Sequence, residues 1–470
     1  MEGNQPKELI ISMEGKLGDV RKSAADQPWE KWSIYRVPRR LRDAHDSKVY
    51  VPQTVSIGPY HHADKQVHCM DRHKWIALNR TLERTGHHLG LYIDAIKKVE
   101  KKARKYYQQD LGHLSSDEFV EMILLDACFI LELFRCSPKV VKCNDSEVPL
   151  VFHLRMIDDI LLDMVMLENQ IPLFVLDTLL GLGCMVAGYP NEEPKEHAVS
   201  LALNLFNSEW LTGAPLQEIE LKELKSSLQS AECLHVLDVF RRSLLHHEPQ
   251  HNPSYPNKSL WRLCDKLIPE CLKKRYHTNQ DCRRRVIHRV AELREAGVKF
   301  RKRNTSLFWD IEFKNGVLEI PSILIHDGTK SILLNLAAFE QCHLEISDAV
   351  VASYAIFMEC LIKSSEDVSY LLRHGIIQHL LGHDDEVVDM LKCVSREMLV
   401  DANGGHYARL TEEVNTYCDQ RWNRWRASFL HRYFKNPWTV TSLVAAVLLL
   451  ALTALQTFYT VYSFYKQKLK

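Results

Sequence analysis

The sequence lacks an excess of charge of either sign, since its 470 residues contain 60 Lys and Arg and 60 Asp and Glu. No global electrostatic field therefore draws the chain onto nucleic acid. The 13 cysteines are dispersed and never form a C-x-x-C pair, so the spacing of a zinc site or of a small disulfide scaffold is absent. The first 19 residues contain no apolar run of the kind found in a secretory signal peptide. These absences favour reduced cysteines that face the cytosol.

Signature motifs of the simple enzyme classes are missing as well. Gly181–Gly183 lacks the third glycine of a dinucleotide fingerprint, Gly328–Ser331 lacks the spaced first glycine of a P-loop, and no G-x-S-x-G occurs. One H-E-x-x-H pattern is present at His247–His251, but Pro249 would break the continuous helix on which two such histidines bind zinc. We therefore interpret that pattern as a solvated loop and expect no metal or cofactor.

Helical periodicity dominates what is present. Hydrophobic residues make up 46% of the chain, which is enough for a sizeable core. Arg72–Lys105 has a helical pattern with a polar, basic face, and Ser116 resembles the N-cap of a helix that includes Met122–Phe134. The apolar residues of Met122–Phe134 fall on nearly all faces, which predicts a central helix. A further buried helix over Met156–Leu167 should end before Pro172, where a new helix can start.

One stretch changes its period. Leu307–Phe313 and Val317–Ile320 flank an Asn-Gly pair at Asn315 and Gly316, which is the strongest short-range signal for a β-hairpin. A helix ending near Glu295 precedes this stretch. The sequence thus predicts a mainly α protein, a single large helical domain with a small β-hairpin near 307–325.

The expected domain organisation follows from composition. Residues 1–30 form an N-terminal segment, and residues 31–435 form the helical body, within which 185–258 is a polar, turn-rich region where the body would divide if it divides at all. A transmembrane helix over 438–459 and a short basic tail at 466–470 complete the chain.

The transmembrane prediction rests on 30 consecutive residues, 436–465, that carry no formal charge. As a helix, the 22 residues of 438–459 would extend about 33 Å, close to the roughly 30 Å of a hydrocarbon core. Aromatic residues suited to a membrane interface stand at its edges: Trp438, Tyr459 and Tyr462. Five cations before the span against three after it favour a single-pass protein with a cytoplasmic body, without distinguishing plasma membrane from endomembrane.

Several acids lie within apolar helical runs, where a carboxylate must pair, accept hydrogen bonds or become protonated. These acids and their candidate cationic partners form a predicted buried polar network: Arg36, Asp126, Glu132, Glu168, Arg294 and Glu359. Structural ion pairs are the more common outcome of such a pattern. A cluster of catalytic carboxylates would have the same sequence signature, so a membrane-tethered enzyme of unknown chemistry is the alternative hypothesis.

Charge is segregated along the chain although its total is zero. Residues 110–170 contain 12 acids and 4 Lys or Arg, whereas residues 271–303 contain 12 Lys or Arg and 3 acids. The candidate basic surface consists of Arg283, Arg284, Arg285, Arg301, Lys302 and Arg303. Docking of this surface onto the acidic segment of the same chain, together with solvated faces, is the favoured interpretation, an anionic lipid comes next, and nucleic acid is unlikely.

Eight segments, in order along the chain, resemble a known family: Ile34–Pro38, Val51–His62, Met122–Phe134, Met166–Pro172, Ala291–Phe300, Gly316–Pro321, Ala338–His343 and Asn436–Trp438. The chain is similar to the plant domain of unknown function 247 family, also catalogued as uncharacterised protein family 0481. The resemblance implies a plant protein with one long helical domain and a C-terminal membrane segment. The family has no agreed activity, so no catalytic residue is carried over.

Some grass members of that family are implicated in pollen-side self-incompatibility recognition, which favours a recognition role. Our leading hypothesis from sequence is a tail-anchored recognition or scaffold protein whose helical body binds a protein partner at a bilayer. Extending a relative's role to this chain is an analogy and carries no residue assignments.

Overall fold

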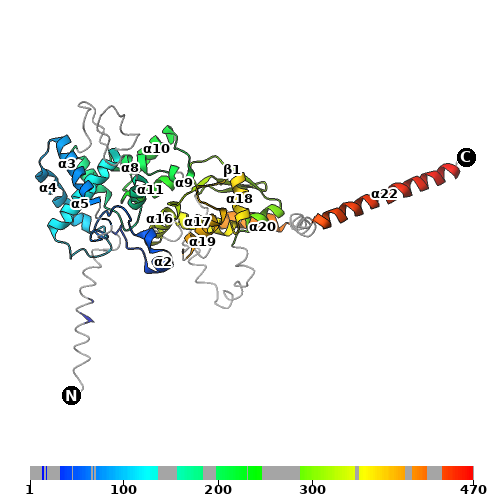
Figure 1. The fold of residues 1–470 in the computed structure, drawn as a ribbon, viewed down its shortest axis with the longest axis horizontal. Coiled ribbons are helices and arrows are strands. Elements are labelled where there is room, and N and C mark those ends of the chain that lie inside the picture. Colours follow the sequence, from blue (N-terminus) through cyan, green and yellow to red (C-terminus); the bar gives the residue numbers. More distant parts are fainter. Residues whose placement is uncertain are drawn as a thin grey trace, which may run out of the picture.

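The structure, a computed structural model, describes most of the chain: residues 32–44, 46–64, 67, 70–135, 156–183, 197–229, 231–245, 286–343, 349–396, 398, 405–420 and 437–468, besides 13, 14 and 17. In the last long segment, side chains are described at 441, 442 and 445–460. Figure 1 shows a helical body in which α3, α4 and α5 lie at one end and α17, α18 and α19 at the other.

The first half of the body is helical: α2 (Arg39–Ala44), α3 (Asp71–Thr85), α4 (Leu89–Arg104), α5 (Ser116–Arg135), α6 (Ile157–Met164), α7 (Leu173–Leu180), α8 (Ala198–Leu205), α9 (Glu209–Thr212), α10 (Glu218–Gln229) and α11 (Val236–Leu245). A short 3₁₀ helix covers Ser47–Tyr50. The predicted helix over 72–105 is divided in two at Gly86, whose φ of 69° ends α3 in the left-handed region. The predicted restart after Pro172 is confirmed by α7.

Helix α5 is the central element of this half, as its apolar pattern predicted. It contacts α3, α4, α7 and α8, and every side chain from Phe119 to Phe134 except Glu121 is buried. Its start is one residue earlier than expected, because Ser115 rather than Ser116 caps it. Ser115 Oγ accepts from the Glu118 N–H at 3.3 Å, and Glu118 Oε2 accepts from the Ser115 N–H at 2.9 Å. This reciprocal pair is a capping box.

The second half combines helices with short strands: α15 (Val290–Glu295), β1 (Lys299–Arg303), β2 (Glu312–Lys314), β3 (Val317–Pro321), β4 (Ile323–Ile325), α16 (Thr329–His343), α17 (Val350–Leu361), α18 (Ser365–Arg373), β5 (Ile377–His379), α19 (Asp384–Ser395), a 3₁₀ turn (Gly405–Tyr407), α20 (Ala408–Asp419) and α22 (Pro437–Lys468). Most of the buried apolar residues between Ile34 and Val414 form one large hydrophobic cluster that joins the two halves.

The predicted hairpin is present, but it belongs to a larger sheet. Strands β2 and β3 pair antiparallel across Asn315 (φ 52°) and Gly316 (φ 77°), the two positive angles of a type I′ turn. Strand β1 then pairs in parallel with β3, which gives the order β1-β3-β2. A separate parallel pair joins β4 to β5. The first predicted strand was too long, since residues 307–311 lie outside β2.

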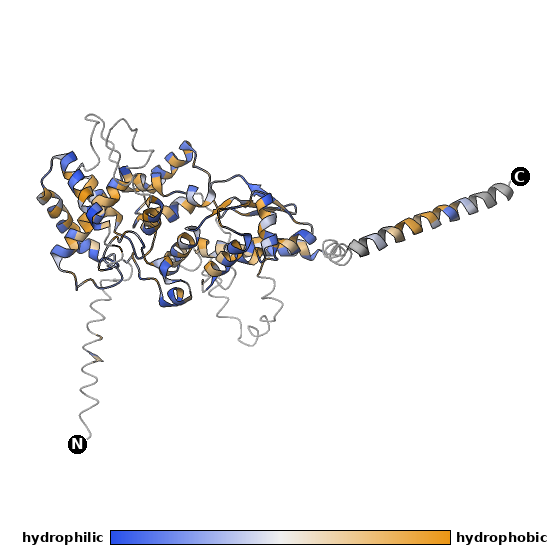
Figure 2. Cartoon of the chain, in the orientation of Figure 1, coloured by the Kyte–Doolittle hydropathy of each residue, from blue (hydrophilic) through white to orange (hydrophobic). Residues whose placement is uncertain are grey.

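The predicted transmembrane helix is the main correction to the expected fold. Residues 437–468 do form a helix, α22, yet no helix in the described parts of the chain is long and apolar enough to cross a membrane. Within α22, an uninterrupted run of side chains is described at residues 445–460. Figure 2 shows that this run is hydrophobic first and more hydrophilic later, where Gln456 and three threonines lie. Of the predicted interface aromatics, Tyr459 is exposed, and the side chains of Trp438 and Tyr462 lie outside the described set.

Candidate functional site: a buried ion-pair network and a lysine face

The segment that precedes α2 is fixed to the end of α4 by backbone hydrogen bonds. The N–H groups of Ser33 and Ile34 both donate to the Tyr106 carbonyl at 2.9 Å, and the Gln108 N–H donates to the Ile34 carbonyl at 3.0 Å. Ile34 and Ser33 are fully buried in the body. This anchoring determines where the next side chain, Arg36, can reach.

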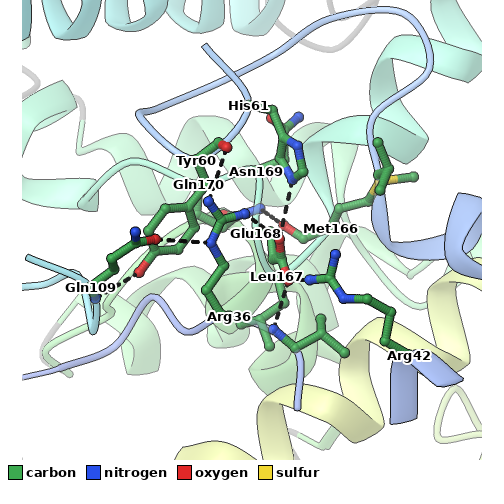
Figure 3. A network of polar contacts seen from close by, with 12 residues as sticks. Arg36, Arg42, Tyr60, His61, Gln109, Met166, Leu167, Glu168, Asn169 and Gln170 are labelled. Carbon is green, nitrogen blue, oxygen red and sulfur yellow. Dashed lines mark hydrogen bonds and ion pairs between the residues drawn. The ribbon is translucent and has the colours of Figure 1, made fainter. Parts of the chain in front are cut away.

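Arg36 reaches Glu168, a fully buried carboxylate in the turn between α6 and α7 (Figure 3). Arg36 Nη1 donates to Glu168 Oε2 at 2.8 Å, Arg42 donates to Oε1, and the backbone N–H of Val37 donates to Oε1 at 2.7 Å. His61 Nε2 lies 3.3 Å from Oε2. Both oxygens of Glu168 therefore have more than one partner, and these partners come from three separate segments.

The Arg36 guanidinium is itself held in place by neighbouring groups. Its carbon lies 4.1 Å from the centre of the Tyr60 ring, and its Nε donates to Gln109 Oε1 at 3.2 Å (Figure 3). A guanidinium above an aromatic face and beside a planar acceptor is well oriented. Arg36 and Glu168, two members of the predicted network, thus form a structural ion pair.

The electrostatics of Glu168 follow from these partners. Burial by itself would raise the pKa of Glu168, but hydrogen bonds from His61, Arg36 and the Val37 N–H, with the nearby charge of Arg42, lower it to about 2. The carboxylate is therefore ionised at any physiological pH. A permanently ionised carboxylate bonded to fixed donors is unsuited to general acid catalysis.

Three further buried acceptors hold the loop 51–61, which faces this network. Asp163 accepts from the N–H groups of residues 53–55 at 2.7–3.1 Å, Asn169 Oδ1 accepts from Ile57 at 2.6 Å, and Asp126 Oδ2 accepts from Gly58 at 2.7 Å. The loop has no regular strand or helix partner, so these side chains satisfy its buried N–H groups.

Gly58 is required in this loop by its backbone. Its φ is 75°, and a Cβ there would lie 2.5 Å from the Gln170 carbonyl oxygen. The Gly58 N–H donates to Asp126, and only glycine fits this backbone without strain.

The other predicted network residues do not gather with Glu168. Each has its own partner: Asp126–Lys74 and Glu132–Arg84, both at 2.6 Å between α5 and α3, Glu359–Lys363 at 2.5 Å, and Arg294 with its guanidinium carbon 3.9 Å from the Tyr370 ring centre. The enzyme hypothesis required these carboxylates in one open pocket. The structure separates them and gives each acid its own cation.

The candidate basic surface is also neutralised locally where it is described. On β1, Arg301 pairs with Glu319 at 3.2 Å, and Arg303 pairs with Asp310 at 2.8 Å and with Glu312. These acids lie on or near β2 and β3, not in the acidic segment 110–170, so the expected docking partner was wrong for both arginines. Lys302 is exposed. Arg283, Arg284 and Arg285 lie outside the described residues, as does the His247–His251 pattern.

A different cationic surface is present on α4. Lys98, Lys101, Lys102 and Lys105 follow the i, i+3, i+4, i+7 spacing of one helix face, and all four are exposed. No ion pair joins any of them to an acid among the described residues, whereas Lys97, on the neighbouring face, pairs with Asp117 at 3.0 Å. We call these four residues the lysine face. Within the described ranges, no group of three metal-binding side chains accompanies it.

Residues 34–452 match the family model described as a plant protein of unknown function, domain of unknown function 247. The chain belongs to this family. The UPF0481 protein At3g47200 of Arabidopsis thaliana is 28% identical over 447 residues, which cover 93% of this chain and 88% of that relative. The putative UPF0481 protein At3g02645 of the same plant is 25% identical, with 92% and 90% covered. No solved structure matches the chain.

Within this domain of unknown function 247 fold, sequence reasoning missed several buried polar residues. Glu340 accepts from the N–H groups of Val351 and Ala352 at the start of α17 and pairs with Arg241 at 2.9 Å. Burial raises the pKa of Glu340 despite these partners. Its segment, Ala338–His343, was recognised as family-like, and an acid at that place in an apolar helix was the available signal. No local sequence signal indicated its partners Val351, Ala352 and Arg241, which lie 11 to 99 residues away from it.

Proposed function

We propose that the protein is a recognition module that binds an acidic surface of a partner protein through the lysine face. The observation that carries the proposal is four exposed lysines in helical register without an acid partner in the described chain. Elsewhere the fold neutralises its cations locally, as at Arg36 and Arg303. Charge left unpaired on one face steers and orients an oppositely charged partner.

The anchoring of residues 32–37 next to the end of α4 supports binding rather than chemistry. Residues 32–37 are fixed at one end by Tyr106 and at the other by Glu168, so the backbone beside α4 is preorganised. Preorganised surfaces lose less conformational entropy on association. A recognition role also agrees, by analogy, with the role in self-incompatibility in which some grass members of the family are implicated.

Site-specific photo-crosslinking tests this proposal. A photo-reactive residue at Asp94, one turn before Lys98 on the exposed side of α4, should capture a reproducible protein in plant cells. That protein, purified separately, should bind the full-length chain with a Kd that rises with salt. Lys98→Glu with Lys102→Glu should raise the Kd by about tenfold or more.

The matched control uses two exposed lysines on β1. Lys299→Glu with Lys302→Glu reverses two positive charges on a different surface, as the α4 variant does on the lysine face. It should leave the Kd for the partner protein within about twofold of the wild-type value. Equal weakening by both variants would show a non-specific charge effect and overturn the proposal. Loss of binding to phosphatidylserine vesicles in the α4 variant, with no crosslinked protein, would assign the face to anionic lipid instead.

A further inference from the structure

A cavity of about 510 Å³ lies beside the C-terminal end of α4. Its walls come from four separate parts of the chain: Trp32, the last turn of α4, the residues before α11, and His343 at the end of α16. Sites of 300–1,000 Å³ with apolar walls and a few polar groups typically bind small organic molecules. The cavity is separate from the Glu168 network and is not required by it.

One side of the cavity is apolar and rigid. Trp32 and Tyr106 supply aromatic rings, and Leu234 supplies an aliphatic surface. The Tyr106 ring lies 5.2 Å from that of Phe174, and the Leu234 carbonyl accepts from the Leu173 N–H at 2.9 Å. These contacts fix the wall before any ligand arrives.

The histidine side of the cavity is fixed by a hydrogen-bonded chain. The Tyr35 hydroxyl lies 2.7 Å from the Trp32 carbonyl and 2.9 Å from His343 Nδ1. The His343 ring stacks on Phe339 at 5.2 Å. Burial lowers the pKa of His343, so at neutral pH the ring contributes hydrogen bonding and not positive charge.

The other residues that line the cavity are charged, and most of them are cationic. Lys101, Lys102 and Lys105 line the cavity with a single acid, Glu232, so three amines less one carboxylate leave a net charge of +2. No ion pair among the described residues neutralises these groups. The Lys102 amine lies 4.2 Å from the centre of the Phe174 ring, which leaves Lys101 and Lys105 as the less constrained amines.

We propose that this cavity binds a small aromatic organic anion, with its ring between Trp32 and Tyr106 and its acidic group on the amines of Lys101 and Lys105. Glu232 accepts a hydrogen bond from a hydroxyl or N–H group of the ligand and disfavours a second anionic group at its own end. This inference goes beyond the proposed function, since it assigns a small-molecule site and needs no protein partner.

Titration calorimetry of the full-length chain with a matched set of probes tests the site. 2-Naphthoate combines the aromatic body with one carboxylate, 2-naphthamide has the same shape without the charge, and acetate has the charge without the ring. We expect 2-naphthoate to bind in the micromolar to low millimolar range, 2-naphthamide about tenfold or more weakly, and acetate not measurably. Absence of 2-naphthoate binding at 5 mM, or equal binding of the neutral amide, would overturn the proposal.

Two variants assign the binding to this cavity. Lys101→Gln with Lys105→Gln should weaken 2-naphthoate about tenfold and remove its preference over the amide, and both residues are exposed, so folding is retained. Lys98→Gln, on the same helix face but outside the cavity, should leave the Kd unchanged. Equal effects of the two variants would overturn the assignment. Trp32→Ala should abolish 2-naphthoate binding, whereas binding of the crosslinked partner protein would persist, so the two proposals fail separately.

Discussion

At the scale of single residues, buried acids act as acceptors that connect distant segments. Glu168 joins residues 36, 37, 42 and 61, and Asp163 joins residues 53–55. In each case the acid accepts a hydrogen bond from at least one backbone N–H that lies outside the helices and strands. A buried N–H without an acceptor costs about 1–3 kcal/mol. Glu168 and Asp163 supply these acceptors, and they thereby stabilise segments that lie outside helices and strands.

Glu168→Gln should be strongly destabilising. It leaves Arg36 and Arg42 without their carboxylate, and because these side chains are 38% and 32% exposed, water screens part of the loss. We expect a decrease of about 2–3 kcal/mol in the free energy of unfolding, measured by urea denaturation. Asp43→Asn, which breaks the exposed pair with Arg39, should change it by less than about 0.5 kcal/mol. Similar losses in both variants would contradict a structural role specific to Glu168.

His235 should make the protein less stable on mild acidification. Burial lowers its pKa to about 4, against partial compensation by the charge of Asp238 and the Ser33 carbonyl. Because the unfolded chain protonates near pH 6.5 and the folded one near 4, stability is lost as the pH falls between these values, by about 2 kcal/mol at pH 5.

His235→Gln is the test of that pH dependence. Urea unfolding at pH 7 and pH 5 should show that acidification costs this variant about 2 kcal/mol less stability than it costs the wild type, because Asp163, whose pKa burial raises to about 6, and His343, whose pKa burial lowers, titrate in both proteins. His62→Gln, at an exposed position, should keep the full difference. If His235→Gln shows the same change in the free energy of unfolding between pH 7 and pH 5 as the wild type, a group other than His235 is responsible for that change.

At the scale of elements, the β2–β3 turn depends on glycine more than its sequence motif alone indicates. Gly316 has a φ of 77°, and a Cβ at that position would lie 2.6 Å from the Tyr417 hydroxyl of α20. Gly316→Ala should therefore add a clash to the cost of a positive φ and lower stability by about 2–3 kcal/mol.

Gly86→Ala is a matched control for the turn, because Gly86 has a φ of 69° and nothing within 4 Å of an added Cβ. It should cost only about 1 kcal/mol, and thermal unfolding of the two variants measures the difference. Equal midpoints would mean that Tyr417 moves aside without cost and that the α20 contact does not constrain the hairpin.

The elements also show what local pattern can and cannot predict. Helix α5 and the Asn315–Gly316 turn were predictable because apolar spacing and turn chemistry are local signals. Strand β1 was not, since Lys299–Arg303 reads as a solvated basic run until Glu312 and Glu319 are placed across from it. Pairing of strands separated in sequence leaves no local signature.

At the scale of the whole molecule, the sequence indicated Glu168 with Arg36 and Arg42 as candidate partners, but it indicated neither His61 as a partner nor the lysine face as a site. Arg42 and His61 contact Glu168 across more than 100 residues of chain. The candidate carboxylates were grouped by sequence context, and the structure distributes them among different cations. Membrane crossing by α22 was the largest error, because a long uncharged run was taken as evidence of a spanning helix.

The boundary between the N-terminal segment and the body remains a prediction that truncation can test. A chain starting at residue 31 keeps the backbone hydrogen bonds of Ser33 and Ile34 and the Val37 contact with Glu168, and it should keep the thermal midpoint of the full-length protein. A chain starting at residue 39 loses Ile34, Tyr35 and Val37, which are at most 8% exposed. At about 1.5–3 kcal/mol for each buried side chain, and with the Val37 N–H bond to Glu168 also gone, the loss approaches the 5–15 kcal/mol that holds a typical domain together. We expect the shorter chain to show no cooperative unfolding transition by circular dichroism. A cooperative transition at an unchanged midpoint would show that residues 32–38 cover the body without stabilising it, and the preorganisation argued for the lysine face would lose its basis.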